Sequence, residues 1–347
     1  MTDDDPLADI DPGPPEPDDP VRPAALVLPA VSEPPLNELG PWLERAEVVD
    51  AVAVPGTDAP LALTADGRAI TTTGIGKSDA ATTVAALLAT PGVDLESAYV
   101  VSCGIAGSSP ETAPLGSVVV ADAVVDWDRK HRWDRSEERD EGFDRDEPDG
   151  RGDSSARGRS GDRAGPSARG RPDDPDRAID LLAYRPRDYV HRLEERVVET
   201  ALEAAHRVDL DADSDAIAYQ KRYPDAPEDG PTVETGTTVC GDEFWHGPRY
   251  AREVEHLCAR YGVGPYATTQ MEDAATARAL ERFGRRDRYL SVRAVANYDR
   301  SAPGESVEES FDGTDASLAL AIENAARVGS AVVDELVAVD PLGLRRD

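Results

Sequence analysis

The sequence predicts an α/β domain in which helices flank a central, largely parallel sheet. Two observations predict it. Short apolar runs typical of buried strands alternate with helical patterns along the chain, and glycines mark the junctions between them. In sheets of this kind ligands bind at the carboxyl ends of the strands, where glycine turns let backbone amides reach them. Polar residues at strand ends are therefore the first candidates for function.

The first half of the chain shows this alternation most clearly. Residues Ser78 to Thr90 form an Ala-rich helical pattern with Ser78 or Asp79 as its cap. The apolar run 24–31 is compatible with a buried strand despite Pro29. Strands are expected at 24–31, 48–54, 69–73, 97–103 and 117–126.

The second half continues the pattern. Apolar residues at helical spacing predict helices, and β-type runs predict strands. Helices are expected at 189–206, 245–261 and 271–283, and strands at 232–240 and 289–297. Residues 315–338 predict a long amphipathic helix that closes the domain.

Three segments are expected to lie outside the packed domain. Residues 1–23 are rich in Asp and Pro, and residues 135–177 consist mostly of Arg, Asp, Gly, Ser and Pro, so neither buries enough apolar surface to offset its ordering entropy. We expect one domain over 24–338, interrupted by a disordered insertion at 135–177 and followed by a tail at 339–347. For the Arg-Gly repeats of the insertion, a solvated loop is the favoured interpretation over an RNA-binding arm.

The charge excludes several kinds of partner. The chain has 69 Asp and Glu against 37 Lys and Arg, a formal net charge of −32. Such a field repels phosphate backbones and anionic head groups, so we expect no nucleic-acid partner. Only three of the basic residues are Lys, and this favours a halophilic surface over that of an acidic mesophilic protein.

Membrane, secretory and metal signals are also weak. No run of 18 apolar residues is present, which predicts no direct membrane insertion. The N-terminus has no basic and apolar leader, so a cytoplasmic location is expected. The cysteines Cys103, Cys240 and Cys258 are far apart without ligands at metal spacing, which predicts reduced thiols and no metal site.

Two glycine-rich junctions are candidates for a binding floor. T-G-I-G-K-S over 73–78 lacks the third glycine of a dinucleotide fingerprint, and a simple strand-to-helix turn is the alternative. G-I-A-G over 104–107 ends the next strand. Together the two junctions would offer backbone amides to one anionic or hydroxyl-rich ligand.

Three further segments carry groups that could contact a ligand. G-D-E-F-W-H-G over 241–247 places two aromatics after a strand, where they can stack on a flat base; its His246 is more often structural than catalytic in such a setting. Q-M-E-D over 270–273 provides a carboxylate that can accept hydrogen bonds from a vicinal diol, with helix capping as the alternative. R-A-V-A-N-Y-D over 293–299 is a strand that ends in polar residues.

Taken in order, these segments resemble the nucleoside phosphorylase superfamily, particularly its methylthioadenosine/S-adenosylhomocysteine nucleosidases. The resemblance is closer still to the purine nucleoside permease group, whose members carry similar G-I-A-G, G-D-x-F-W-H-G, A-M-E-D and R-x-A-S-N-F-D stretches. It covers about 24–338 apart from the insertion. It implies a nucleoside phosphorylase-like three-layer sandwich, a purine nucleoside as ligand and a homo-oligomer.

The resemblance also implies residue roles. Phe244 would stack on the purine, Glu272 would hold the ribose hydroxyls, and Asn297 falls where the nucleosidases have the Asp that protonates N7. Asp299 is a substitute acid, which makes Asn297 and Asp299 the candidate catalytic residues. The implied substrate-binding residues are Phe244, Trp245, Met271, Glu272, Gly104, Ala106, Gly107 and Gly76.

The nucleophile stays open at this point. Ser102 stands where related phosphorylases place an Arg, and Ile105 stands where the relatives have a hydroxyl. Arg293 is a candidate for binding phosphate as co-substrate, and Glu33 a candidate for activating water; no other cofactor is expected. Glycosidic-bond cleavage by phosphate or water is the leading hypothesis. The alternatives are nucleoside binding without catalysis in an uptake function, and a structural or regulatory protein with a degenerate site.

Overall fold

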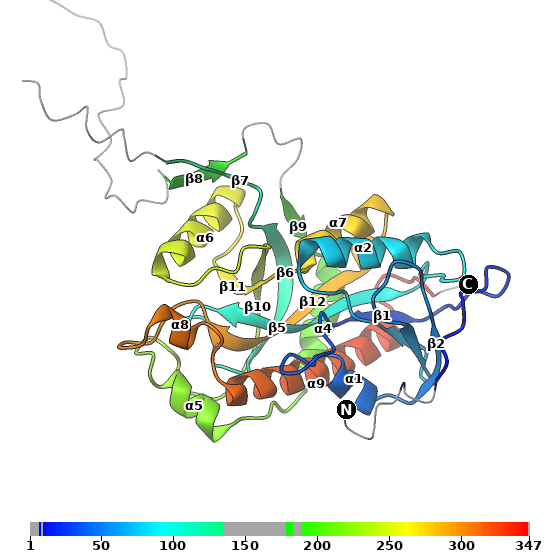
Figure 1. Cartoon of the computed structure of the whole chain (residues 1–347), viewed down its shortest axis with the longest axis horizontal. Helices are drawn as coiled ribbons and strands as arrows, with labels where there is room; N and C mark the ends of the chain where they lie inside the picture. The colour runs from blue at the N-terminus through cyan, green and yellow to red at the C-terminus, as the bar shows by residue number, and fades with distance from the viewer. Residues whose placement is uncertain (1–6, 8–9, 135–177, 183–188, 346–347) are drawn as a thin grey trace, which may run out of the picture.

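The computed structural model describes residues 7, 10–134, 178–182 and 189–345. The insertion expected at 135–177 lies outside these residues. Within them the domain is a three-layer arrangement of a mixed, largely parallel sheet between two layers of helices, as the sequence predicts (Figure 1).

The central sheet is built from strands of both halves of the chain. Its order is β11-β10-β6-β12-β5-β1-β4-β3-β2, with β9 paired to β6. The pairs β4–β1, β1–β5, β5–β12, β6–β10 and β10–β11 are parallel, whereas β6 runs antiparallel to β12. The strands are β1 (Ala25–Leu28), β2 (Val48–Val52), β3 (Leu61–Thr64), β4 (Arg68–Ile70), β5 (Tyr99–Ser108), β6 (Val118–Asp126), β9 (Val190–Arg192), β10 (Val233–Cys240), β11 (Tyr266–Gln270) and β12 (Tyr289–Tyr298). A separate small sheet pairs β7 (Lys130–Arg132) with β8 (Ile179–Leu181).

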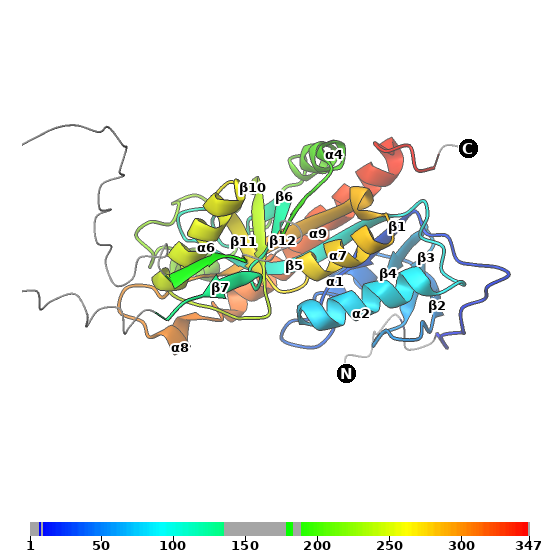
Figure 2. The same ribbon diagram turned by 90° about the horizontal axis from the view of Figure 1, so that it is seen from above.

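Helices cover both faces of the sheet. In Figures 1 and 2, α2 and α7 run side by side over one face, while α9 crosses the other with α1 and α4 packed against it. Local signals set several helix ends: Pro248 begins α6, left-handed Gly262 ends it, and Thr314 and Ser317 form a capping box at the start of α9. The helices are α1 (Gly40–Glu44), α2 (Gly76–Ala89), α4 (Glu195–Ala205), α5 (Ser214–Gln220), α6 (Pro248–Tyr261), α7 (Asp273–Arg282), α8 (Val307–Ser310) and α9 (Asp315–Val339), with a 3₁₀ turn at Arg286–Arg288.

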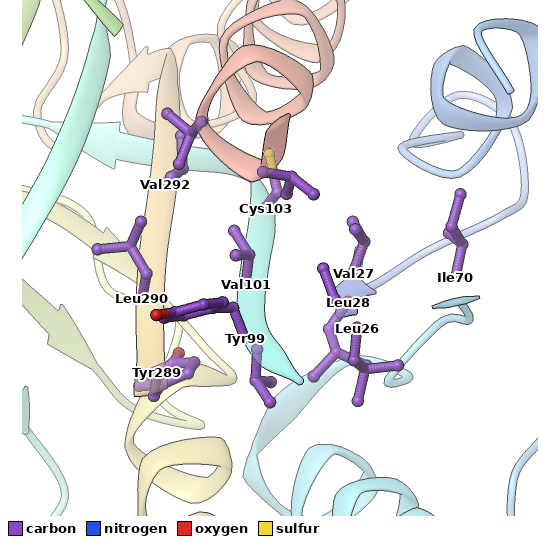
Figure 3. Close-up of a cluster of buried hydrophobic side chains, with 14 of the residues drawn as sticks. Leu26, Val27, Leu28, Ile70, Tyr99, Val101, Cys103, Tyr289, Leu290 and Val292 are labelled. Atoms are coloured by element: carbon purple, nitrogen blue, oxygen red, sulfur yellow. The ribbon is translucent and has the colours of Figure 1, made fainter. Parts of the chain in front are cut away.

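The core lies along the three central strands β1, β5 and β12. Leu26, Val101 and Val292 are fully buried. Side chains on both faces of these strands are mostly apolar, because helices cover both faces of the sheet. Figure 3 shows Cys103 and Val292 pointing toward the helix above them, and the Cys103 thiol donates a hydrogen bond to the carbonyl of Ala325 in α9. Burial raises the pKa of the Cys103 thiol far above its ordinary value, so this cysteine is an inert part of the core.

Helix α9 is the one helix in the described part of the chain that is long and apolar enough to cross a membrane. Its best 18-residue window has a mean hydropathy of 1.2, and 56% of that window is buried inside the domain. The core helix of a globular domain has the same length and composition, and α9 packs across β5, β6 and β12.

The structure extends two expected boundaries. Residues 10–22 lie along the domain, with backbone pairing of Gly13 to Val52 and of Val21 to Val93, although composition predicts no order there. Backbone hydrogen bonds to exposed strand and loop edges replace the apolar burial that the segment lacks. At the other end, Leu342 packs against the core and its amide donates to the Tyr99 hydroxyl, so part of the expected tail belongs to the domain.

Strand β5 differs from expectation in the place that matters most for function. We expected the strand to stop at Cys103 and G-I-A-G to form a turn, but β5 continues through Gly104 and Gly107 to Ser108. It does so because β12 pairs with it over this whole stretch. The glycines are therefore needed for close approach by neighbouring side chains rather than for a turn.

Candidate functional site

One cavity of about 410 Å³ opens at the carboxyl ends of β5, β11 and β12. Gly107 pairs with Thr269 of β11 on one side and with Asn297 of β12 on the other, so these three residues lie across adjacent strands. Loops before α1, α2 and α6 and the start of α9 complete the walls. The cavity lining is Val31, Pro35, Leu36, Ile75, Ile105, Ala106, Gly107, Phe244, Thr269, Gln270, Met271, Glu272, Ala296, Asn297, Phe311, Asp312, Gly313, Thr314, Asp315 and Leu318. Its size and mainly apolar walls are those of a small-molecule site.

Aromatic rings form the outer wall. Phe244 lies in the loop before α6, is 59% exposed and meets Phe311 edge to face with centroids 5.7 Å apart. Trp245 does not line this cavity; it packs against Trp127 and Tyr266 and borders two adjoining hollows. Phe311, just before α9, carried no signal in the sequence because it has no motif around it.

Glu272 lies at the floor of the cavity at the start of α7. Gln270 accepts hydrogen bonds from the amides of Glu272 and Asp273, which fixes the backbone here. The Glu272 carboxylate accepts from the Gly76 amide at 3.1 Å. Burial raises the pKa of Glu272, and the charge of Arg293 opposes that rise. Gly76 therefore contributes an amide to Glu272 rather than a surface to the ligand.

Arg293 lies beneath this floor and does not line the cavity. It is almost fully buried and forms ion pairs with Asp273 and, at 3.4 Å, with Glu272. Its guanidinium is thus occupied by two carboxylates of the protein. Glu33, the other residue considered for the nucleophile, is exposed and lies outside the lining.

Asn297 presents a defined hydrogen-bonding group to the cavity. Its Nδ2 donates to the carbonyl of Phe311 at 2.6 Å, and a carbonyl can only accept, so the amide orientation is fixed. Its Oδ1 lies 3.3 Å from the position that a Cβ on Gly107 would occupy. Asp299 lies in the small adjoining hollow, where Tyr266 and Arg300 hydrogen-bond its carboxylate.

Glu38 belongs to no motif and was not among the residues predicted from the sequence. It lies in the loop before α1, and its carboxylate accepts from the amides of Ala30 and Ile105, both at 2.7 Å. Burial raises the pKa of Glu38 to about 7, against the lowering effect of Arg293 and of the two amide bonds. Ile105 lines the cavity, which places Glu38 next to the cavity floor, close enough to Glu272 for their charges to interact.

Gly104 provides the space for Glu38. A Cβ at residue 104 would lie 2.3 Å from a Glu38 carboxylate oxygen, so no other residue fits while Glu38 keeps its place. We expect Gly104→Ala to displace Glu38 and lower the free energy of unfolding by about 1–3 kcal/mol. Thermal unfolding measures this, with Gly264→Ala, where the space is open, as the control. Equal stability of the two variants would contradict the close packing.

The cavity is acidic. Its charged lining residues are Glu272, Asp312 and Asp315, and among the described residues no Lys, Arg or His lines it. In the same part of the chain no group of three or more His, Cys, Asp or Glu is arranged to hold a metal ion.

Comparisons with known proteins identify the family to which this chain is similar. Residues 30–339 match the family described as purine nucleoside permease. A probable purine nucleoside permease of Schizosaccharomyces pombe is 28% identical over 77% of this chain and 74% of its own, and the purine nucleoside permease of Candida albicans is 23% identical over 86% and 72%.

Solved structures establish the fold as nucleoside phosphorylase-like. Futalosine hydrolase of Helicobacter pylori matches with a TM-score of 0.55 at 19% identity, over 91% of this chain and 99% of that one. The 5'-methylthioadenosine/S-adenosylhomocysteine nucleosidase of Neisseria meningitidis, in complex with methylthio-immucillin-A, matches with a TM-score of 0.54 at 20% identity, over 90% and 98%.

Proposed function

Since the chain belongs to the purine nucleoside permease family, we propose that it binds a purine nucleoside in this cavity and hydrolyses the N-glycosidic bond. The observation that carries the proposal is that Phe244, Glu272, Asn297 and Gly107 line one shared cavity. An aromatic ring can stack on the base of a nucleoside, a buried carboxylate can accept hydrogen bonds from the sugar hydroxyls, and a fixed amide can hydrogen-bond the edge of the base. The names of the solved nucleosidases support the same chemistry.

The sugar would be held by Glu272, with Met271 beside it. The Oε1 atom of Glu272 accepts a hydrogen bond from the Gly76 amide, and the carboxylate has further lone pairs that can accept from the 2'- and 3'-hydroxyls. Fixing the ribose at this point lets the bond to the base stretch while positive charge develops on C1', next to a cavity lined by carboxylates.

Water fits the cavity better than phosphate as the nucleophile. A phosphate dianion needs cationic or amide donors, but the charged residues of the described lining are all acidic and Arg293 is already paired with Asp273. Glu38, with a pKa of about 7, is suited to accept a proton. In the proposed step the water oxygen bonds to C1', the C1'–N9 bond breaks, the water proton passes to Glu38, and the base leaves with the electron pair and takes a proton from solvent.

Asn297 would stabilise the departing base by donating the second N–H of its Nδ2, since the first is donated to the carbonyl of Phe311. Asn297→Ala is expected to lower the rate of base release about 10–100-fold while the affinity for nucleoside changes less, because the negative charge on the base develops only as the bond breaks. Single-turnover rates and equilibrium binding separate the two. An unchanged rate would remove Asn297 from the chemistry.

The experiment that tests the function is direct. The purified protein is incubated with adenosine and inosine, with and without phosphate, at several salt concentrations, and free base is measured by chromatography. Base release independent of phosphate is the expected result. Release only with phosphate would replace hydrolysis by phosphorolysis.

The second candidate is nucleoside binding without cleavage, in an uptake function. The family description favours it, and so does Asn297, because an amide cannot donate a proton to the leaving base as a carboxylic acid does. Tight nucleoside binding in calorimetry without any release of base would support this candidate over the enzyme.

A further inference from the structure

We propose that Lys77 is a positioning residue that holds the binding groups of the cavity in place without touching the ligand. It acts through a cluster that we call the Lys77 clamp, made of Lys77, Asp126, Asp128 and Asp242. The inference rests on the proposed function, because the group it positions is the sugar-binding carboxylate of Glu272.

The side chain of Lys77 joins two carboxylates at the end of β6. Its Nζ lies 2.7 Å from Asp126 Oδ1 and 2.7 Å from Asp128 Oδ2, and the Lys77 side chain is only 14% exposed. Burial alone would lower the pKa of Lys77, but the charge of Asp126 and the bonds to both carboxylates outweigh it and the pKa is raised. The ammonium is therefore firmly charged, and it neutralises two carboxylates that would otherwise repel each other.

The backbone of Lys77 joins the same cluster to a second wall of the cavity. The Lys77 amide donates to Asp242 Oδ1 at 2.7 Å, and the Asp242 amide donates to Asp128 Oδ2 at 2.9 Å. Asp242 lies two residues before Phe244. Asp128 thus receives both the ammonium and the Asp242 amide, so one carboxylate connects the start of α2 with the loop that carries the aromatic wall.

The clamp fixes the peptide that serves Glu272. Gly76 immediately precedes Lys77, and its amide donates to Glu272 Oε1 at 3.1 Å. A Cβ on Gly76 would lie 3.0 Å from Asp242 Oδ1, so the turn and the clamp are in close contact. Gly76 also has a φ of +86°, and this backbone conformation is maintained by the hydrogen bond from Gly76 to Glu272 and by the clamp. If the clamp opens, the amide of Gly76 and the ring of Phe244 both lose their fixed positions.

A purely structural ion pair would stabilise the fold without affecting the cavity, and Arg68 provides that comparison. Arg68 is likewise a poorly exposed cation: it is ion-paired to Asp66 at 3.0 Å and to Asp334, and hydrogen-bonded to Ser330 at 2.9 Å, between β4 and α9. It takes no part in the cavity lining. Arg68→Met is therefore the matched control for Lys77→Met.

The first measurement is hydrogen exchange on the full chain, which needs no ligand. In Lys77→Met we expect exchange at the amides of residues 74–78 and 242–244 to become at least tenfold faster, and in Arg68→Met we expect no change there. The double variant Lys77→Met/Asp126→Asn also removes one of the two facing carboxylates and so their mutual repulsion. It provides the same measurement if the single variant unfolds. Unchanged exchange in both segments would overturn the proposal.

The second measurement connects the clamp to the cavity, with adenosine and inosine as probes. We expect Lys77→Met to weaken nucleoside binding and to lower kcat/KM by at least tenfold, Lys77→Arg to stay within about threefold of wild type, and Arg68→Met to leave both unchanged. Normal binding in a folded Lys77→Met protein would overturn the proposal. A wild-type protein that neither binds nor cleaves nucleosides refutes the proposed function instead, and the exchange result then decides on the clamp alone.

Discussion

Glu38→Gln is expected to lower the rate of base release by 10²–10⁴-fold, the usual contribution of a general base, and to leave nucleoside affinity nearly unchanged. The reason is that the Glu38 carboxylate is buried, 5% exposed, next to the cavity floor, and burial raises its pKa to about 7. Its two backbone donors, Ala30 and Ile105, hold it without neutralising it. The measurement is kcat for the release of free base.

The pH dependence gives this prediction its sharpest form. Because Glu38 accepts a proton only when ionised, the wild-type rate should rise with pH and level off above about 7. Glu33→Gln, in the same loop but exposed, is the matched control and should keep both rate and profile. A Glu38→Gln variant with wild-type activity would require another base.

The same titration has a stability consequence with a definite sign. The pKa of Glu38 is raised in the folded state from 4.5 to about 7, so its stabilising contribution is fully present below pH 4.5 and is lost as the pH rises through 7. The unfolding free energy of wild type relative to Glu38→Gln should therefore fall by about 3 kcal/mol over this range. A difference that is constant with pH would show that Glu38 titrates normally.

The second large effect is expected at Glu272. Glu272→Gln should lower kcat/KM for nucleosides by about 100-fold or more, because an amide nitrogen would replace one acceptor oxygen and face donors of the protein, the Gly76 or Met271 amide and the Arg293 guanidinium. Steady-state kinetics with adenosine or inosine measure it.

Free purine base is the internal control for this variant. Glu272 is assigned to the sugar alone, so inhibition by the free base should stay within about threefold of wild type. Equal losses for base and nucleoside would mean that the substitution disturbs the whole cavity and that Glu272 does not specifically hold the ribose.

The sequence predicted most of the fold because both faces of the sheet are buried. β1 is a continuous apolar run, β6 and β12 are mostly apolar and almost fully buried, and the residue ranges of all three are close to those expected. Five strands were missed: β3, β7, β8, β9 and β11. β3 is only four residues long and β11 (Y-A-T-T-Q) is Thr-rich, so neither stands out from its surroundings. β7, β8 and β9 have three residues each, and β9 lies in the segment 189–206 that was expected to be helical.

The extent of β5 could not be predicted for a different reason. Glycine in a sequence indicates freedom of the backbone, but it does not tell whether that freedom serves a turn or a close contact. At Gly104 the contact is with Glu38, whose carboxylate also bonds to Ile105 across 67 residues of sequence. Such a pair has no local pattern.

In the site, too, residues within local motifs could be predicted and residues placed by long-range packing could not. The motifs that end strands identified Phe244, Glu272 and Asn297, which the structure places around one cavity. Phe311 and Glu38 lie in loops between elements, and only the packing of those loops against the sheet brings them to the site. Arg293 lies within β12 as expected, but its ion pair with Asp273 depends on how α7 starts, which the strand pattern does not contain.

The hydrogen bond from Asn297 to the carbonyl of Phe311 has a consequence for selectivity. A free amide can rotate by half a turn and exchange its donor and acceptor, so it reads opposite hydrogen-bonding patterns equally well. Here the main chain of another segment forbids the rotation. Replacing the side chain of Phe311 should thus change the affinity for a base. The preference of Asn297 for donors or acceptors on the base edge should not change, provided that the carbonyl of residue 311 stays in place.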